Sequence, residues 1–402
     1  MKQTEVVGVE DTLIPDDWEV KRLGEVCDTS SGGTPSRNNE TFFRGNIKWF
    51  TTTELRDCFL YDSVEHITQK AVDLSSAKLF PKNTLLMAMY GATIGRLGIL
   101  TNQATTNQAC CAIFPHQVDV LFLFYYLLYI RESIISLGSG AGQPNISQEI
   151  VKGLNIILPP LPEQQRIAKA LSDVDALIST TEKLLQKKKN IKQGAMQNLL
   201  TGKKRLPGFA KSTNYKQTEL GLIPEDWEVK SLGEVATIIG GGTPSTTVAE
   251  YWNGNIEWFT PTEITDSQKY VSNSLRTITV SGLHNSSAKL LPTGTILLTT
   301  RATIGIAAIT KKEVCTNQGF QSLVVRNNCD NEFLYYVIPL LKEEMLSRAS
   351  GSTFAEISSK KLSTIQFSFP PKEEQTAIAN VLSSMDKEIE TLNTKLEKYR
   401  NL

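Results

Sequence analysis

Apolar residues near the end of the chain repeat with the period of a helix seam. Their spacing alternates between four and three residues over Ile378, Leu382, Met385, Ile389, Leu392, Leu396 and Tyr399. A stripe of this kind, with polar residues elsewhere, is typical of a coiled coil. The pattern predicts one long helix over 372–402, starting after the proline pair at 370–371.

An earlier stretch, 161–202, carries the same pattern with interruptions. Its seam residues are Ile167, Leu171, Val174, Ile178 and Leu185, and it resumes at Ile191, Met196 and Leu199. Thr181 and Lys188 break the seam. A globular core could cover such a stripe, but the polar remainder favours one partner per helix, the other helix. One helix leads from the first half of the chain to the second and the other leads back, so we expect them to pair antiparallel. About 38 helical residues span about 57 Å.

The segments between these helices contain short apolar runs separated by Gly, Pro, Thr and Asn. This pattern predicts a mixed α/β (α+β) fold with short strands, for example at 84–89 and 295–300. A helix is expected at 121–130 and again at 333–341.

The chain contains one duplication. Residues 14–26 (I-P-D-D-W-E-V-K-R-L-G-E-V) recur almost unchanged at 223–235. Six further segments return at an offset of 209 to 211 residues: G-G-T-P-S at 32–36, N-I-K-W-F at 46–50, S-S-A-K-L at 75–79, A-T-I-G at 92–95, T-N-Q at 106–108 and P-P-L-P-E-Q at 159–164. We therefore expect two similar globular domains related by a pseudo-twofold axis. The boundaries predicted are a first domain at 1–160, a helix at 161–202, a linker at 203–221, a second domain at 222–371 and a helix at 372–402.

Composition narrows the classes of protein. The 42 basic and 42 acidic residues cancel, which argues against nucleic-acid binding by global charge alone. The six cysteines form no C-x-x-C pair, so we expect no metal site. The apolar run at 120–130 is too short for a membrane span and the N-terminus lacks an apolar signal core, so we expect a cytoplasmic protein.

The repeated motifs, taken together, resemble those of the specificity (S) subunits of type I restriction–modification systems. The resemblance covers nearly the whole chain and depends on the combination of duplicated motifs and paired helices, since no single motif is decisive. It implies that each globular domain is a target recognition domain that reads one half of a bipartite double-stranded DNA sequence. The helices then set the spacing and dock two methyltransferase (M) subunits, and two restriction (R) subunits complete the enzyme. S-adenosylmethionine, ATP and Mg²⁺ would belong to these partners, which methylate adenine N6 or cleave DNA, and this chain would have no catalytic residues.

The second helix stops at Asn401-Leu402, where the first copy continues to Gly202. Three explanations stay open on the sequence alone: a clipped chain, a truncated natural gene, or weaker docking of M on that side.

Candidate DNA-contacting residues lie in the two identical G-G-T-P-S loops and in segments that differ between the copies. The G-G-T-P-S loops offer Thr34, Ser36 and the adjoining Arg37, and Thr243 and Ser245, near backbone N–H groups suited to phosphate. Purely structural turns would have the same sequence. The segments around A-T-I-G, interpreted as short strands, offer Tyr90, Arg96, Thr300 and Arg301. The polar loop at 138–147 offers Gln143 and Asn145, whose amides suit adenine but also form turns.

Two other function classes remain open on the sequence alone. A scaffold whose domains bind protein would leave similar loops. A self-contained methyltransferase would need an [N/D/S]-P-P-[Y/F/W] element, whereas the Pro-Pro pairs here are flanked by Leu158 and Leu161 or by Phe369 and Lys372. The segment at 15–21 imitates a metal-nuclease motif, but its carboxylates are too close in sequence to converge on a metal, and Trp18 and Trp227 are better interpreted as domain anchors.

Overall fold

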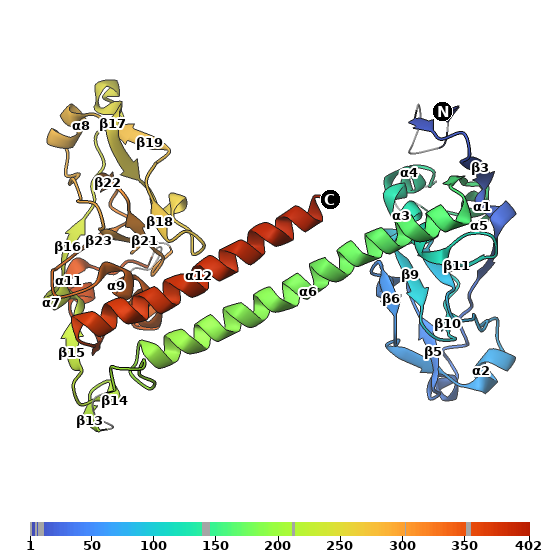
Figure 1. The fold of residues 1–402 in the computed structure, drawn as a ribbon, viewed down its shortest axis with the longest axis horizontal. Helices are drawn as coiled ribbons and strands as arrows, with labels where there is room; N and C mark the ends of the chain where they lie inside the picture. The colour runs from blue at the N-terminus through green and yellow to red at the C-terminus, as the bar shows by residue number, and fades with distance from the viewer. Residues whose placement is uncertain are drawn as a thin grey trace. The chain divides into compact units, whose positions relative to one another are not determined.

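The computed structural model describes residues 2–4, 6, 12–138, 145–210, 214–301, 303–350 and 355–402. The chain divides into two compact units, Met1–Ile178 and Ser179–Leu402. Each unit contains one of the two sheet-rich domains (Figure 1).

The first unit is built around a five-stranded sheet. Its strand order is β4 (Cys27–Ser31), β11 (Cys110–Pro115), β8 (Leu85–Ala88), β9 (Leu97–Leu100) and β6 (Cys58–Leu60). Only β6 runs parallel to its neighbour. A three-stranded sheet holds β10 (Thr105–Thr106), β5 (Ile47–Phe50) and β7 (Glu65–Ile67), and two strand pairs join β1 (Lys2–Thr4) to β2 (Thr12–Ile14) and β3 (Glu19–Arg22) to β12 (Asn155–Leu158).

The helices of the first unit are mostly short. They are α1 (Leu23–Val26), α2 (Gln69–Asp73), α3 (Val120–Tyr129), α4 (Arg131–Ser136), α5 (Gln148–Gly153) and the first part of the long α6 (Leu161–Leu199), whose residues after Ile178 belong to the second unit, with 3-10 turns η1 (Glu40–Phe43), η2 (Thr52–Glu54) and η3 (Gly91–Thr93). The side chain of Asp119 caps α3 by accepting hydrogen bonds from the backbone of Leu121 and Phe122. The helix expected at 121–130 is thus confirmed.

Every residue of strand β8 is apolar, and the packing on its two faces explains why. Leu85 and Met87 point into the core that includes α3, whereas Leu86 and Ala88 point into a second apolar cluster on the other face. Alternate side chains of a strand face opposite sides, so a strand covered on both sides must be apolar at every position.

The second unit repeats this topology. Its five-stranded sheet has the order β16 (Ala236–Gly240), β23 (Gln321–Val325), β20 (Ile296–Leu298), β21 (Ala307–Thr310) and β18 (Tyr270–Val271), again with a parallel edge strand. The three-stranded sheet holds β19 (Arg276–Ile278), β17 (Trp252–Phe259) and β22 (Val314–Thr316), and the strand pairs are β13 (Tyr215–Thr218) with β14 (Gly221–Pro224) and β15 (Glu228–Ser231) with β24 (Gln366–Phe369). The expected mixed α/β fold with two similar domains is confirmed.

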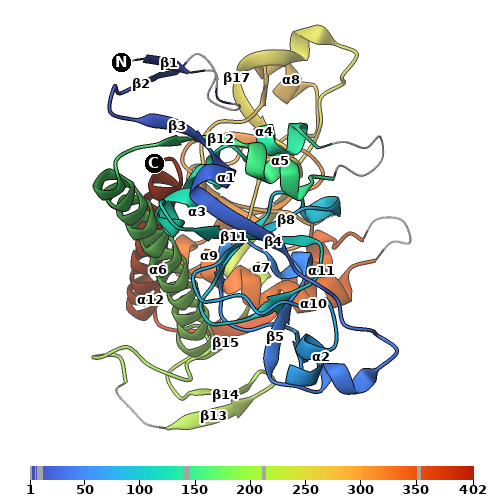
Figure 2. The same ribbon diagram turned by 90° about the vertical axis from the view of Figure 1, so that its right-hand side faces the viewer.

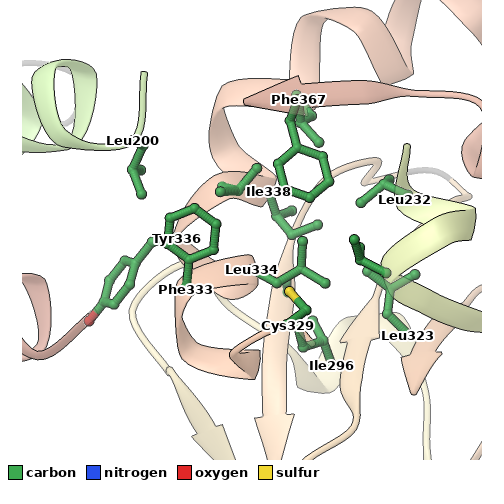
Figure 3. Close-up of a cluster of buried hydrophobic side chains, with 14 of the residues drawn as sticks. Leu200, Leu232, Ile296, Leu323, Cys329, Phe333, Leu334, Tyr336, Ile338 and Phe367 are labelled. Atoms are coloured by element: carbon green, nitrogen blue, oxygen red, sulfur yellow. The ribbon is translucent and has the colours of Figure 1, made fainter. Parts of the chain in front are cut away.

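The helices of the second unit complete the correspondence. They are α7 (Leu232–Val235), α8 (Val280–His284), α9 (Asn331–Val337), α10 (Lys342–Arg348), α11 (Ser359–Ser363) and α12 (Lys372–Arg400), with 3-10 turns η4 (Ala249–Tyr251), η5 (Pro261–Glu263) and η6 (Ile338–Leu341). Pro339 ends the helix expected at 333–341 early, because proline lacks the N–H that continues the α-helical pattern. The core of this unit packs α9 against β20, β23 and β24, and Leu200 reaches it from the end of α6 (Figure 3).

The second half of α6 pairs with α12 in antiparallel orientation. Three ion pairs join the helices: Glu182 to Arg400 at 2.6 Å, Lys188 to Glu388 at 2.6 Å and Lys192 to Asp386 at 2.5 Å. As the residue number rises along α6, the number of the paired residue in α12 falls, so the two helices run in opposite directions. The two helices lie side by side in both views (Figures 1 and 2). The antiparallel helix pair expected from the sequence is confirmed.

The seam between these helices differs in detail from the sequence pattern. Thr181, Leu185 and Leu396 are buried, and the four-three spacing continues on α6 to Lys188 and Lys192. The lysine stems cover the seam while their ammonium groups reach Glu388 and Asp386. The interpretation that Ile191 resumes the seam was wrong. It is 48% exposed, because it lies about 100° around the helix from Lys192.

Other seam residues pack on the domains. Ile167 contacts the core of the first unit, and Ile378 and Leu382 belong to that of the second, with Met385 packed beside them. Val174, Ile178, Ile389 and Leu392 are partly buried. Leu171 is 41% exposed, so its role as a partner contact stays a prediction.

Each domain also hydrogen-bonds to its own helix through a tyrosine. Tyr125 of α3 donates to Asp175 of α6 at 2.7 Å, and Tyr336 of α9 donates to Asp386 of α12 at 2.6 Å. Asp386 also accepts the ion pair from Lys192, so one carboxylate links α9, α12 and α6 in the second unit.

A buried ion pair anchors the start of α12. The guanidinium of Arg205, in the linker after α6, pairs with Glu374 at 2.6 Å and with Asp226 at 2.8 Å. The indole of Trp227 donates to Glu374 at 2.9 Å. The side chains of Arg205 and Glu374 are 6% and 1% exposed. Burial opposes the charge of Arg205, but the hydrogen bonds and charges of Asp226 and Glu374 outweigh it and raise the pKa of Arg205.

The first unit has a reduced version of this contact. Glu163, the counterpart of Glu374, accepts a hydrogen bond from Trp18 at 3.2 Å and has no ion pair among the described residues. Trp18 and Glu163 are only partly buried.

The two glutamates therefore predict unequal effects of the same substitution. Glu374→Gln removes the charge of the more deeply buried of the two carboxylates that pair with Arg205, while Asp226 keeps its ion pair. The substitution should cost the second domain about 1.5–3 kcal/mol of unfolding free energy. Glu163→Gln should cost the first domain about 1 kcal/mol, the value of one hydrogen bond. Urea unfolding combined with hydrogen exchange of peptides from each domain measures both; equal losses would contradict this account.

Candidate nucleic-acid interface

The two G-G-T-P-S loops are held tightly against the domain body. A Cβ on Gly32 would lie 2.1 Å from the hydroxyl of Thr106, and one on Gly33 would lie 2.2 Å from the carbonyl oxygen of Ser76. The indoles of Trp49 and Trp258 donate to the carbonyls of Gly33 and Gly242 at 2.9 and 2.8 Å. The glycines are therefore required by close backbone approach.

The polar residues of these loops divide into engaged and exposed groups. Thr34 and Thr243 donate to Gln108 and Gln318 at 2.5 and 2.6 Å. Ser36 and Ser245 are exposed, and Ser245 shares a hydrogen bond with Thr247. The threonines thus shape the loops, while the two serines remain accessible. A DNA contact by these four residues stays a prediction.

Arg37 follows the first loop and covers two aromatic rings. Its guanidinium lies 4.3 Å from the ring centroid of Phe43 and 5.1 Å from that of Trp49. It also makes two hydrogen bonds to Glu65, at 2.5 and 2.7 Å. These bonds hold the pKa of Glu65 below its ordinary value, so the carboxylate stays charged and the pair carries no net charge.

The second domain places a different arginine over the corresponding rings. Arg276 of β19 lies 3.7 Å from the ring centroid of Trp252 and 5.5 Å from that of Trp258. Its position in the sheet is that of Glu65, because Trp258 pairs with Arg276 as Trp49 pairs with Glu65. Arg276 is not among the DNA-contacting residues expected from the sequence. Only the strand register reveals the exchange, since Arg37 has a threonine, Thr246, as its counterpart.

The sequence pattern predicts a short strand at the A-T-I-G segment of the first domain. The structure shows a turn there instead. Residues Gly91–Thr93 form the 3-10 turn η3 between β8 and β9. Gly91 and Gly95 have φ values of +71° and +75°, which only glycine adopts readily. In the second domain Gly305 has φ +90°. A turn therefore presents the flanking side chains in both domains.

In both domains the residue before this turn forms a backbone bridge, with residue 145 in the first domain and residue 356 in the second. Tyr90 forms a backbone bridge with Asn145, and Arg301 forms one with Glu356. Arg301 also makes a 2.6 Å ion pair with Glu356. The structure thus brings Tyr90 and Asn145 together, and a DNA contact by either residue stays a prediction. Gln143 lies outside the described residues.

Two further candidates are engaged by their own domains in different ways: Arg96 makes an ion pair but its side chain is 51% exposed, so a DNA contact by Arg96 stays a prediction, whereas Thr300 is buried. Arg96 pairs with Asp57 at 2.5 Å, and Asp57 also contacts Arg131. Thr300 is fully buried, with its hydroxyl toward the carbonyl of Gly319. The suggestion that Thr300 contacts DNA was wrong, because alternate positions of this extended segment point inward.

Metal and membrane features are absent from the described part of the chain. It contains no group of three or more His, Cys, Asp or Glu side chains placed to hold a metal ion. Among its helices none is long and apolar enough to cross a membrane.

Comparison with known proteins identifies the duplicated domain. The family model of the type I restriction modification DNA specificity domain matches residues 15–193 and 224–398. Over 401 residues the chain is 27% identical to the putative type I restriction enzyme MjaX specificity subunit of Methanocaldococcus jannaschii, covering 96% of this chain and 90% of that protein. The MjaIX specificity subunit of the same organism is 40% identical over 185 residues, which is 45% of this chain and 43% of that protein.

Solved structures agree on the fold. The type I restriction–modification S subunit from M. genitalium superposes with a TM-score of 0.58 at 16% identity, over 97% of this chain and 95% of that one. Together with the two matched segments, which cover most of the sequence, this places the chain in the family of type I restriction modification DNA specificity domain proteins, with two copies of the domain.

Proposed function

We propose that this protein is the DNA-reading specificity subunit of a type I restriction–modification enzyme, in which each recognition domain reads one half of a bipartite target. The observation that carries the proposal is the duplication: two copies of a DNA specificity domain, each continuing into a copy of the same helix, with the helices paired antiparallel. Antiparallel copies are related by a twofold axis, and a twofold protein matches half-sites spaced along one face of the duplex.

The differences between the two domains support recognition of two different half-sites. The Tyr90–Asn145 pair of the first domain is replaced by the Arg301–Glu356 pair of the second. Amide and hydroxyl groups hydrogen-bond to different base edges from those that an arginine side chain recognises. An identical scaffold with altered surface pairs is therefore suited to two unlike sequences.

The helices supply the remaining part of the proposal. We infer that α6 and α12 set the separation of the half-sites and dock two M subunits, with two R subunits completing the enzyme. The balanced charge of the chain supports dependence on partners, because phosphate neutralisation needs an excess of basic groups. S-adenosylmethionine, ATP and Mg²⁺ are assigned to the partners, and this chain is proposed to be non-catalytic.

Co-expression with a methyltransferase subunit of the same system tests the function directly. We expect N6-methyladenine at a split sequence motif throughout the host genome, and its disappearance when this chain is deleted. The methyltransferase expressed alone serves as the control. Methylation that persists without the chain, or a continuous motif, would contradict the proposal.

Domain exchange tests the independence of the two readers. Replacing 27–150 with the same region of a relative should change one half of the split motif and leave the other half and the spacer intact. The matched exchange of 236–361 should change only the other half. Genome-wide methylation mapping gives both results, and a change in both halves from one exchange would refute independent domains.

A further inference from the structure

A guanidinium lies over an aromatic pair in both recognition domains, but it comes from different places in the chain. In the first domain Arg37 extends from the loop to Phe43 and Trp49. In the second, Arg276 extends from β19 to Trp252 and Trp258. The positive group therefore lies at the same place in both domains, although it comes from a different position in the sequence of each.

The two guanidinium groups differ in how their charge is balanced. Arg37 is held by both oxygens of Glu65. Arg276 takes the place of that glutamate and has no ion pair among the described residues. The nearby carboxylate of Glu257 is occupied by Lys312 at 2.6 Å and by Ser274. The second domain thus has a net positive group where the first has a neutral pair.

The aromatic rings also orient Arg276. Trp252 and Trp258 are perpendicular, with centroids 5.1 Å apart, and both are buried. A guanidinium 3.7 Å from an indole centroid gains cation–π energy and keeps its N–H donors directed away from the ring. Arg276 itself is exposed. An arginine fixed in this way has a fork of donors prepared for an anionic or acceptor-rich group.

The surroundings of Arg276 are those of the candidate interface. The indole of Trp252 donates to the carbonyl of Ser245 at 3.1 Å, and that of Trp258 donates to Gly242, so both rings support the second G-G-T-P-S loop. In the second unit, β17 and β19 lie at the end of the domain away from the start of α12 (Figure 1).

We propose that Arg276 is a DNA contact of the second recognition domain, and that its guanidinium binds paired acceptor atoms, either phosphate oxygens or O6 and N7 of guanine. This inference rests on the proposed function. It assigns an asymmetry to the subunit: the second domain uses this position to bind DNA, whereas in the first domain Glu65 neutralises the corresponding arginine.

The test compares Arg276→Gln with the double variant Arg37→Gln/Glu65→Gln in the complex with the methyltransferase. Binding is measured on a duplex that carries the split target found by methylation mapping. We expect Arg276→Gln to weaken binding about tenfold or more, and the double variant to weaken it less than about threefold, because the net charge of that site does not change. Both melting temperatures should stay near that of the unchanged protein.

The same titrations distinguish the two acceptors. Contact with a phosphate predicts equal weakening on all duplexes and a salt dependence reduced by about one unit of slope. Contact with guanine predicts lost discrimination at one base pair of one half-site. Unchanged binding by Arg276→Gln, or equal losses from both variants, would overturn the assignment.

A third variant keeps the test informative even if Arg276→Gln misfolds. Glu65→Gln releases Arg37 on its aromatic pair and should strengthen DNA binding, a gain that misfolding does not produce. If Arg276→Gln lowers the melting temperature, unchanged affinity of Glu65→Gln overturns the proposal. Failure of the unchanged complex to bind the split target would instead overturn the proposed function, and this inference with it.

Discussion

The antiparallel pairing of α12 with the second half of α6 is the constraint on which the rest of the structure depends. Its seam is apolar at Leu185 and Leu396 but continues through Lys188 and Lys192, which reach Glu388 and Asp386. Exposed ion pairs contribute little energy, so they define register and direction more than stability. Stability at the start of α12 comes from the buried contacts of Glu374 with Arg205 and Trp227 and from the apolar core beneath Ile378.

The duplicated domains keep the same internal supports and differ at their surfaces. Trp49 and Trp258 hold the same glycine loop through the same hydrogen bond, and Tyr125 and Tyr336 attach each domain to an aspartate of its helix. Around these shared contacts, the exposed residue pairs differ between the two domains. A scaffold that preserves geometry while its surface chemistry varies is what recognition of two unlike half-sites requires.

The sequence alone predicts the periodic and repeated features well. The heptad spacing and the duplication indicate the helices, their direction and the two similar domains, because both depend on patterns that extend over many residues. It fails where one residue's direction matters. Ile191 is apolar yet lies off the seam, Thr300 points into the core, and the A-T-I-G segment turns at glycines with positive φ. Arg276 could not be identified, because its relation to Glu65 depends on strand register and not on sequence identity.

The central claim is that the helix pair sets the distance between the DNA half-sites, and its length offers the most direct measurement. Seven residues inserted after Asn190 in α6 and seven after Lys387 in α12 keep the seam in phase and preserve the ion pairs on either side. Each insertion adds about 10 Å of helix, equivalent to about three base pairs. Methylation mapping should then reveal the same two half-sites with a longer spacer; an unchanged spacer, or altered half-sites, would contradict the account.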